Sequence, residues 1–429
     1  MRTMVREIDL RDPLPDLTAG EHPSSFGGAL VLVRRHTVPL GYVRVDLTAG
    51  DPREALADAL HEQLHRAVGD ALGSRVEQLT AGVAATDGDC ARLGERLDAI
   101  REGLRFSVVV CTCRRPARLK DCLEALRHQD YERFEVVVVD NTPGDPAVDT
   151  VLEELALDVP LRRVVEPYQG VSRARNAGVA VAAGEIVAFI DDDAIPDRHW
   201  VAELACGYRS VGAAAVVNGA IAPGALDTPA QEWFRQYGGH SKGRHFEQEV
   251  FDPPVPGVQS PLYPLPPFGA GGNMSFRREV LLDIGGFDEA LGSGTPARGG
   301  EDTAAFTIAL LRGHVIVFRP AALVWHSDRE SYEQLEAQFH ALGTSLSAYY
   351  TSLVLRDPRL LGPLARLLPR GLNDLTGGKK SLRTATMDET FPPQLLRAYR
   401  RGLVGGPFAY VRGRVAKRRF PVSRSTERR

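Results

Sequence analysis

Four short apolar runs of strand length, separated by helical stretches, follow one another from residue 106 onward. The runs are rich in valine and isoleucine and span residues 107–111, 134–139, 161–165 and 185–190. Helical stretches at residues 117–127 and 171–183 join the first run to the second and the third to the fourth. Near-continuous apolar strands that alternate with helices are typical of a parallel sheet covered on both faces. The sequence therefore predicts an α/β fold with a mostly parallel sheet.

Polar residues follow three of these runs, at the points where the predicted strands end. Thr112 to Arg115 follow the first run, Asp140 and Asn141 follow the second, and Asp191 to Asp193 follow the fourth. Ligands of such sheets bind beyond the carboxyl ends of the strands. We therefore expect these residues to converge on one crevice.

Three consecutive aspartates, Asp191, Asp192 and Asp193, form the most distinctive of these polar segments. Ionised together in a crevice of low dielectric constant, they would repel one another. A divalent cation such as Mg²⁺ or Mn²⁺, which binds carboxylate, water and phosphate oxygens, would relieve the repulsion. The alternative is an exposed turn before a helix that opens at Pro196 and Asp197. The turn taken alone leaves both interpretations open.

The segment from Gly170 to Gly178 opens a predicted helix that leaves Arg173 and Asn176 on one face, beside the apolar stripe. The N-terminal amides of this helix and its arginines suit an anion. The alternative is a surface helix with solvated arginines, which is the ordinary case. Because the segment lies immediately before the acidic run, we favour the anion site.

Three later segments have both a structural and a chemical interpretation. Residues 268–276 form a predicted glycine-rich loop that matches neither the dinucleotide-binding motif nor the P-loop motif. Glu301 and Asp302 either cap the helix that follows them, or one of them is a general base. His326, at the end of an apolar segment, is either a structural histidine or a metal ligand.

Composition excludes several other classes of protein. The chain has 429 residues, and its 52 basic and 55 acidic residues give a formal net charge of −3, so no overall field draws it to nucleic acid. The five cysteines form no C-x-x-C pair, which argues against a zinc site or a disulfide framework. The charged N-terminus does not fit a signal peptide, and no apolar run reaches the length of about 18 residues needed to span a membrane. We expect a cytoplasmic protein, soluble or attached to the inner face of the membrane.

In this order, the motifs resemble those of the family 2 glycosyltransferases, which are inverting, nucleotide-sugar-dependent enzymes with the GT-A fold. The resemblance covers about residues 106–330. The segments that carry it are Ser107–Pro116, Val139–Asn141, Gly170–Gly178, Gly184–Asp193, Gly285–Phe287, Glu301–Asp302 and Trp325–His326.

The resemblance implies a role for each candidate residue. It implies that Thr112, Arg114 and Asp140 hold the nucleotide base and ribose, and that Arg175 and Asn176, with Arg173 as an alternative cation, lie on the donor side. It implies a divalent metal, Mg²⁺ or Mn²⁺, held by Asp193, Asp191 and His326, with Asp192 and Asp191 also near the donor. It implies Asp302 as the catalytic base, beside Glu301. The implied partners are a nucleotide-diphosphate sugar and a glycan, lipid-linked or small-molecule acceptor.

Three regions are predicted. Residues 1–104 form a small α+β unit, with a hairpin of residues 29–33 and 42–47 followed by a helix at 51–68. Residues 105–330 form the GT-A-type domain, with a nucleotide-binding half at 105–220 and an acceptor half at 221–330. Residues 331–429 form a helical extension.

The chain ends in a basic tail. From Val411 onward, one glutamate, Glu427, faces the basic residues Arg412, Arg414, Lys417, Arg418, Arg419, Arg424, Arg428 and Arg429. A solvated, disordered end is the ordinary interpretation, and attraction to an anionic membrane is the functional one.

Two other function classes remain open at this point. A sugar-phosphate nucleotidyltransferase also uses an acidic metal site, although the glycine-rich triphosphate loop that such enzymes usually need after the first strand is missing here. A non-catalytic scaffold with the same fold is the third class.

Overall fold

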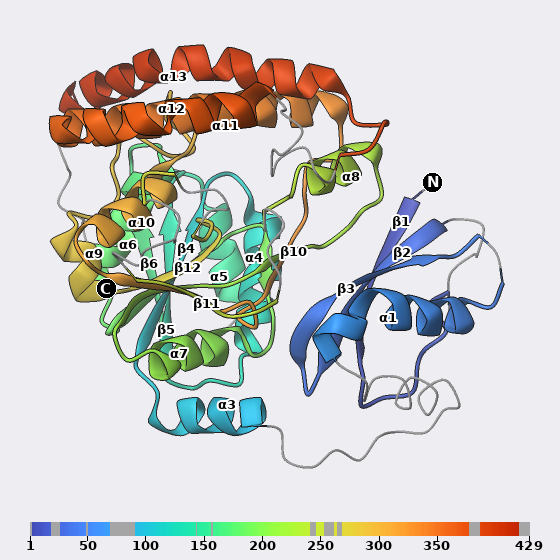
Figure 1. The fold of residues 1–429 in the computed structure, drawn as a ribbon. Coiled ribbons are helices and arrows are strands. Elements are labelled where there is room, and N and C mark those ends of the chain that lie inside the picture. The colour runs from blue at the N-terminus through green and yellow to red at the C-terminus, as the bar shows by residue number, and fades with distance from the viewer. Residues whose placement is uncertain are drawn as a thin grey trace.

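An eight-stranded sheet forms the centre of the computed structural model (Figure 1). The structure describes residues 2–18, 26–48, 50–68, 91–142, 144–155, 158–240, 246–252, 261–263, 268–376 and 387–419. The strand order is β11-β13-β9-β12-β7-β4-β5-β6. The strands are β4 (Phe106–Thr112), β5 (Phe134–Asp140), β6 (Leu161–Val165), β7 (Ile186–Asp191), β9 (Ala214–Asn218), β11 (Glu249–Phe251), β12 (Asn273–Arg277) and β13 (Val315–Phe318). In this sheet β11 and β12 are antiparallel to the other six strands, which confirms the predicted, mostly parallel sheet.

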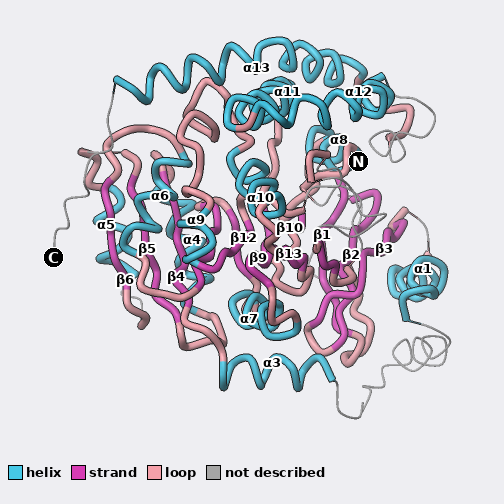
Figure 2. The backbone as a smooth tube through the Cα atoms, turned by 60° about the vertical axis from the view of Figure 1, so that its left-hand side comes forward, coloured by secondary structure: helices cyan, strands magenta, loops and turns pink. Residues whose placement is uncertain are grey.

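Helices cover both faces of this sheet (Figures 1 and 2). One face packs against α4 (Pro116–Arg127), α5 (Ala147–Leu155) and α7 (Trp200–Ser210). The other packs against α6 (Val171–Val181), α9 (Arg278–Asp283) and α10 (Glu301–Leu311). Alternate residues of β4 enter the two cores, with Val108 and Val110 on one side and Val109 on the other. This double burial explains the continuous apolar runs in the sequence.

The glycine-rich segment differs from the prediction, because its second half is the strand β12 in the middle of the sheet. The predicted loop accounts only for residues 268–272. Asn273 and Ser275 are fully buried and hydrogen-bonded, Asn273 to the carbonyls of Ala220 and Ala322 and Ser275 to that of Val217. Buried polar side chains that find such partners are stable inside a sheet, yet they hide the strand from an apolar pattern.

The segment after Asp191 to Asp193 also differs from the predicted structure. Residues 194–196 form a short strand, β8 (Ala194–Pro196), and the helix begins at Trp200 instead of at Pro196. A small second sheet has the order β10-β14-β8, with β10 (Ile221–Pro223) and β14 (Val324–His326). Between β10 and the glycine-rich loop lies α8 (Pro229–Gln236), and its N-cap Thr228 forms a capping box with Gln231.

The N-terminal region is a three-stranded sheet with one helix. The predicted hairpin is present as β2 (Phe26–Arg35) and β3 (Val38–Asp46), and the predicted helix as α1 (Pro52–Val68). An additional strand, β1 (Arg2–Asp9), pairs in parallel with β2. Leu32 of this sheet shares an apolar cluster with Phe318 and Leu323, and Tyr42 and Trp325 pack against that cluster. The N-terminal sheet therefore packs directly against the segment that leads to His326.

Three long helices and a short 3₁₀ turn form the C-terminal extension (Figure 1). They are α11 (Tyr332–Arg356), η2 (Pro358–Leu360), α12 (Leu361–Thr376) and α13 (Pro393–Arg419). Helix α13 lies along α11, and α3 (Ala91–Glu102) packs on α7 at the opposite end of the molecule (Figure 1). The first nine residues of the basic tail, 411–419, are helical instead of disordered, and residues 420–429 lie outside the described part.

No helix in the described part of the chain is both long enough and apolar enough to cross a membrane. Cys111, Cys113, Cys122 and Cys206 are free thiols, and Cys90 lies outside the described residues.

Candidate active site

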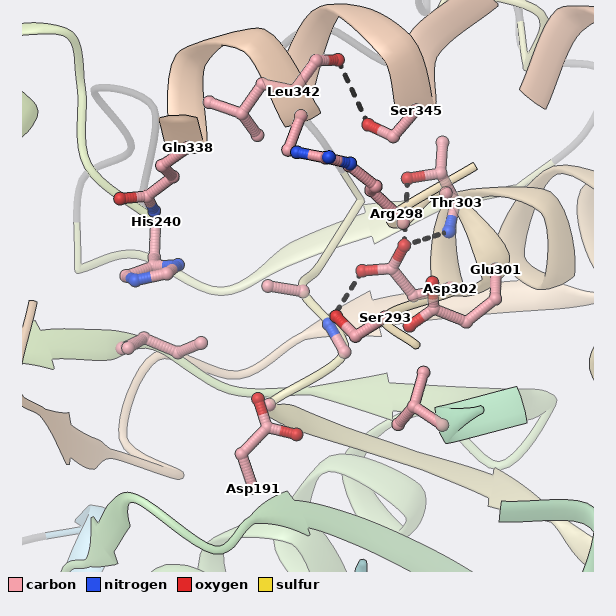
Figure 3. Close-up of a pocket in the computed structure, with 18 of the residues that line it drawn as sticks. Asp191, His240, Ser293, Arg298, Glu301, Asp302, Thr303, Gln338, Leu342 and Ser345 are labelled. Carbon is pink, nitrogen blue, oxygen red and sulfur yellow. Dashed lines mark hydrogen bonds between the residues drawn. The ribbon is translucent and has the colours of Figure 1, made fainter. Parts of the chain in front are cut away.

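A cavity of ≈ 670 Å³ lies between the carboxyl end of β7, the 269–272 loop, the start of α10 and the side of α11 (Figure 3). In Figure 3, Asp191 lies on the opposite side of the cavity from Gln338, Leu342 and Ser345 of α11. The sheet register explains why polar groups gather at this edge. Thr112 pairs with Asp140, and Cys111 with Asp191, so the three strands β5, β4 and β7 end level with one another.

Asp302 lies at the start of α10, with its carboxylate held by backbone amides. Its Oδ2 accepts a hydrogen bond from Gly271 N at 2.8 Å, and its Oδ1 accepts one from Thr303 N at 2.6 Å. Gly300 caps the helix with φ 89°, a left-handed conformation that favours glycine. This turn directs Asp302 into the cavity and fixes the orientation of its carboxylate.

Arg175 connects the acidic residues of the cavity. Its guanidinium donates to Glu301 Oε1 at 2.7 Å, to Asp191 Oδ1 at 3.2 Å and to the Gly271 carbonyl at 3.0 Å. The side chain is buried, and although burial alone would lower its pKa, the Glu301 and Asp191 carboxylates raise it. Arg175 is thus a permanent buried cation that holds β7, α10 and the 269–272 loop together.

Glu301 is the cavity carboxyl with the most altered proton affinity. Burial, and then the neighbouring Asp302 carboxylate, raise its pKa from 4.5 to about 7, against the opposing effect of Arg175. Its carboxyl therefore binds a proton more tightly in the folded protein than in the unfolded chain.

Replacing Glu301 with glutamine is expected to change the pH dependence of stability. The pKa of Glu301 is higher in the folded protein than in the unfolded chain, so the proton that Glu301 binds stabilises the folded state. This stabilisation is fully present below about pH 4.5 and is lost as the pH rises through about 7. Between pH 5 and 8 the wild-type free energy of unfolding should therefore fall by up to a few kcal/mol more than that of Glu301→Gln. Thermal unfolding across this range measures the difference. The exposed Glu279→Gln on α9 is the control, and parallel curves for Glu301→Gln and wild type would contradict the expectation.

The acidic turn is neutralised by side chains of the protein. Thr112 Oγ1 donates to Asp192 at 2.7 Å, and Arg115 contacts Asp192 at 3.1 Å and Asp193 at 2.6 Å. Burial raises the pKa of Asp192 to about 6. For Asp193, burial alone would raise the pKa, but the hydrogen bond and charge of His326, together with the charges of Arg115 and Arg329, lower it to about 2. Since Arg115 and Arg175 together contact all three aspartates, the turn does not by itself require a metal ion.

His326 lies between two carboxylates. Its Nε2 is 3.4 Å from Asp193 Oδ1, and its Nδ1 is 3.1 Å from Asp328 Oδ1, which also contacts His240 Nε2 at 3.0 Å. Burial alone would lower the pKa of His326, but the two carboxylates raise it to about 10. Among the described residues, His240, His326 and Asp328 are the one group of three whose ligand atoms lie within 4.8 Å of one another. The expected set of Asp191, Asp193 and His326 is therefore only partly assembled, because Asp191 faces Arg175.

The structure separates the remaining candidates. Asp191, Arg175, Glu301, Asp302 and His326 line the main cavity. Asp193 lines a neighbouring cavity of ≈ 320 Å³ with Arg115 and Asp328, and Arg329 lies on the walls of both.

Six other candidates do not line the main cavity, and one of them is Asp192, whose contacts with Thr112 and Arg115 are given above. Asp140 is buried against Arg163 at 2.7 Å, Arg173 contacts Glu289 at 3.5 Å, and Thr112 contacts Asp192. Arg114 is exposed at a left-handed backbone position, with φ 57°. Asn176 exchanges hydrogen bonds with the backbone of Phe287, so its amide holds the Gly286 turn instead of facing the cavity.

Sequence reasoning missed several polar residues of the site. His240, Arg298, Asp328 and Arg329 all line a cavity, and each lies in a loop or turn. It also missed the cavity wall on α11, which includes Leu342, Leu346 and Tyr349. The position of Asp328, two residues after His326, was a signal in the sequence.

Comparison with known protein families finds a match to one family. Residues 107–285 match the family model described as Glycosyl transferase family 2. The chain is 28% identical over 198 residues to the glucosyl-dolichyl phosphate glucuronosyltransferase of Haloferax volcanii, covering 44% of this chain and 58% of that protein. It is 30% identical over 235 residues to the succinoglycan biosynthesis protein ExoM of Rhizobium meliloti, covering 52% of this chain and 67% of that protein.

Two solved structures are also similar. The mannosyltransferase PcManGT from Pyrobaculum calidifontis, in complex with GDP-Man and Mn²⁺, is 19% identical with a TM-score of 0.43, covering 78% of this chain and 85% of that one. TarS 1–349 of S. aureus, in complex with UDP-GlcNAc, is 18% identical with a TM-score of 0.41, covering 72% and 92%.

Proposed function

Because the chain belongs to glycosyl transferase family 2, we propose that it moves a sugar from a nucleotide-diphosphate sugar to an acceptor hydroxyl, with inversion at the anomeric carbon. One observation carries the proposal: Asp302, far in the sequence from the Asp191 strand end, lies on the wall of the same cavity. A base and a donor-side group that face one space are what a single in-line displacement requires.

Asp302 is the proposed general base. A protonated hydroxyl is a poor nucleophile, so a carboxylate must take its proton as the bond to the sugar forms. The amides of Gly271 and Thr303 hold the Asp302 carboxylate, and the acceptor hydroxyl would approach it from the α11 side of the cavity. The acceptor, a glycan, a lipid-linked or a small molecule, would then contact Gln338 and Ser345.

The donor would occupy the β4, β5 and β7 end of the site. Thr112, Arg114 and Asp140 lie at or just beyond these strand ends and would hold the base and ribose. Departure of a nucleoside diphosphate builds negative charge, which preorganised cations stabilise. Arg115, Arg298 and Arg329 are exposed cations beside the two cavities and would supply such charge.

A divalent metal fits part of this site. Asp193 and His326 bring a carboxylate oxygen and an imidazole nitrogen to 3.4 Å of one another, and with His326 deprotonated they form a donor pair suited to an ion such as Mn²⁺. Asp191 and Asp192 carry further carboxylates next to this pair. Bound there, the ion would act as a Lewis acid on the diphosphate. Arg115 would have to release Asp193 for the ion to bind with both carboxylate oxygens.

The test is a panel of nucleotide sugars scored by slow hydrolysis of the donor, with added Mn²⁺ or Mg²⁺ and with chelator. We expect one donor to be hydrolysed, faster with metal than with chelator. This experiment needs no knowledge of the acceptor. If no nucleotide sugar binds or is hydrolysed under any metal condition, the proposal is wrong.

Asp328 is expected to position His326 for the metal. The Oδ1 of Asp328 accepts a hydrogen bond from Nδ1 of His326, and Nε2 of His326 is then directed at Asp193. Loss of such an outer carboxylate typically weakens metal affinity by about 10–100-fold. We therefore expect Asp328→Asn to weaken Mn²⁺ binding by that factor, measured by titrating the free-ion electron paramagnetic resonance signal. The exposed Asp58→Asn on α1 is the control, and wild-type affinity in Asp328→Asn would contradict this role.

A further inference from the structure

We propose that the outward face of α13 docks on an anionic lipid bilayer. This face, which we call the α13 stripe, consists of Val404, Phe408, Val411 and Val415. The proposal goes beyond glycosyl transfer and does not depend on it. It also differs from a charged, disordered tail, because it places the contact on the helix α13.

The α13 stripe contains the two most exposed large apolar residues in the described part of the chain. Val404 and Phe408 are each 74% exposed, and Val411 and Val415 are each 49% exposed. Their spacings of four, three and four residues place them within an arc of about 60° on the helix, at about 100° per residue. Single exposed apolar residues are ordinary, but a continuous stripe of four marks an interaction surface.

Close packing fixes the direction in which the stripe points. The opposite face of α13 is buried against α11 and includes Ala398, Gly402 and Gly406. A methyl group on Gly402 would overlap the His340 carbonyl, and one on Gly406 would overlap the Thr344 carbonyl. Glycine therefore brings the two backbones into contact, and α13 cannot turn to bury its stripe without losing this fit.

The charge of α13 matches an anionic surface. The helix contains no aspartate or glutamate between Pro393 and Arg419, and it contains eight basic residues: Arg397, Arg400, Arg401, Arg412, Arg414, Lys417, Arg418 and Arg419. Arg397, Arg400 and Arg401 are exposed before the stripe, and Arg412 and Arg414 are exposed beside it. Arg401 pairs with Glu336 of α11 at 2.9 Å. An apolar stripe bordered mainly by basic residues is the pattern of a helix that lies in a membrane interface.

The same charge argues against a second copy of the chain as the occupant. Two α13 stripes packed together would bring two sets of basic side chains close, with no acidic residue on the helix to compensate. Lipid phosphates supply the opposite charge that a second copy lacks. The bilayer is therefore the occupant that satisfies both the apolar and the charged part of the surface.

The test measures binding of the full chain to vesicles by co-sedimentation. Phosphatidylcholine vesicles are compared with vesicles that also contain phosphatidylglycerol, at low and high salt. Two double variants probe the surface, Val404→Ser/Phe408→Ser for the stripe and Arg412→Gln/Arg414→Gln for the charge. Two controls change matched exposed residues elsewhere, Leu282→Ser on α9 and Arg92→Gln/Arg101→Gln on α3.

The wild type and both controls should bind the anionic vesicles, more weakly at high salt. The stripe variant should lose about tenfold or more in affinity, and the charge variant should lose about tenfold at low salt. Wild-type binding by the stripe variant, or no binding by the wild type, would overturn the proposal. So would a dimer in light scattering that Val404→Ser/Phe408→Ser dissociates without any vesicle binding. Because vesicle binding needs no nucleotide sugar, it can fail or succeed independently of the transferase assignment.

Discussion

Replacing Asp302 with asparagine should lower the rate of sugar transfer by roughly 10²–10⁴, the usual contribution of a general base. The asparagine carbonyl oxygen retains an acceptor for the Gly271 amide, so the 269–272 loop should keep its position, while the Thr303 amide at the start of α10 loses its acceptor. What the variant loses is the ability to take the proton of the acceptor hydroxyl. Initial rates with the donor found in the nucleotide-sugar panel, and donor affinity by calorimetry, give the two measurements.

Donor affinity is the internal control for this variant. It should stay near the wild-type value, because the amide is isosteric with the carboxylate that it replaces. Asp283→Asn on α9 removes an exposed carboxylate and should leave the rate unchanged. An Asp302→Asn protein that transfers sugar at the wild-type rate would show that another group is the base.

Replacing Arg175 with methionine should lower the free energy of unfolding by about 3 kcal/mol, as expected when one partner of a buried ion pair is removed. The variant leaves the Glu301 carboxylate buried without its cation, and it removes the donor for the Gly271 carbonyl. This expected loss of stability is at the lower end of the range for breaking a buried ion pair, because the second partner of Arg175, the Asp191 side chain, is 41% exposed. Urea unfolding monitored by circular dichroism measures the change.

A double-mutant cycle isolates the ion pair. Arg175→Met combined with Glu301→Gln should be more stable than the sum of the two single changes predicts, because the buried Glu301 charge is no longer left without its cation. Arg175→Lys should lie between wild type and Arg175→Met, since lysine keeps the charge but not the forked geometry. Strict additivity of the two changes would show that Arg175 and Glu301 do not interact.

The sequence predicted the central sheet because its strands are buried on both faces. Valine-rich runs such as 134–139 carry an unambiguous signal, and their order along the chain was enough to place Asp140 and Asp191 at one edge. The family resemblance pointed to Asp302 and His326, and the structure brings both to the wall of one cavity. The central sheet was therefore predictable from its apolar runs, and Asp302 and His326 were predictable from the family resemblance.

The parts that depend on long-range polar contacts were not predictable. The strand β12 contains Asn273 and Ser275, whose burial depends on carbonyl partners from distant segments. The partners of the acidic turn, Arg115 and Arg175, come from the starts of two different helices. A pattern of residue types in sequence does not reveal which arginine will meet which aspartate after folding.

The contact between the N-terminal sheet and the strand before His326 has a consequence for any shortened protein. Leu32 belongs to the cluster that includes Leu323, and Trp325 is packed against it. Trimming the chain to residues 107–285, the part that the family model matches, would discard both Asp302 and His326. A longer fragment that includes these two residues but omits residues 1–48 would lose the contact of Leu32 with the apolar cluster beside β14. The N-terminal sheet therefore packs beside the strand that carries His326, and we expect the smallest active fragment to include it.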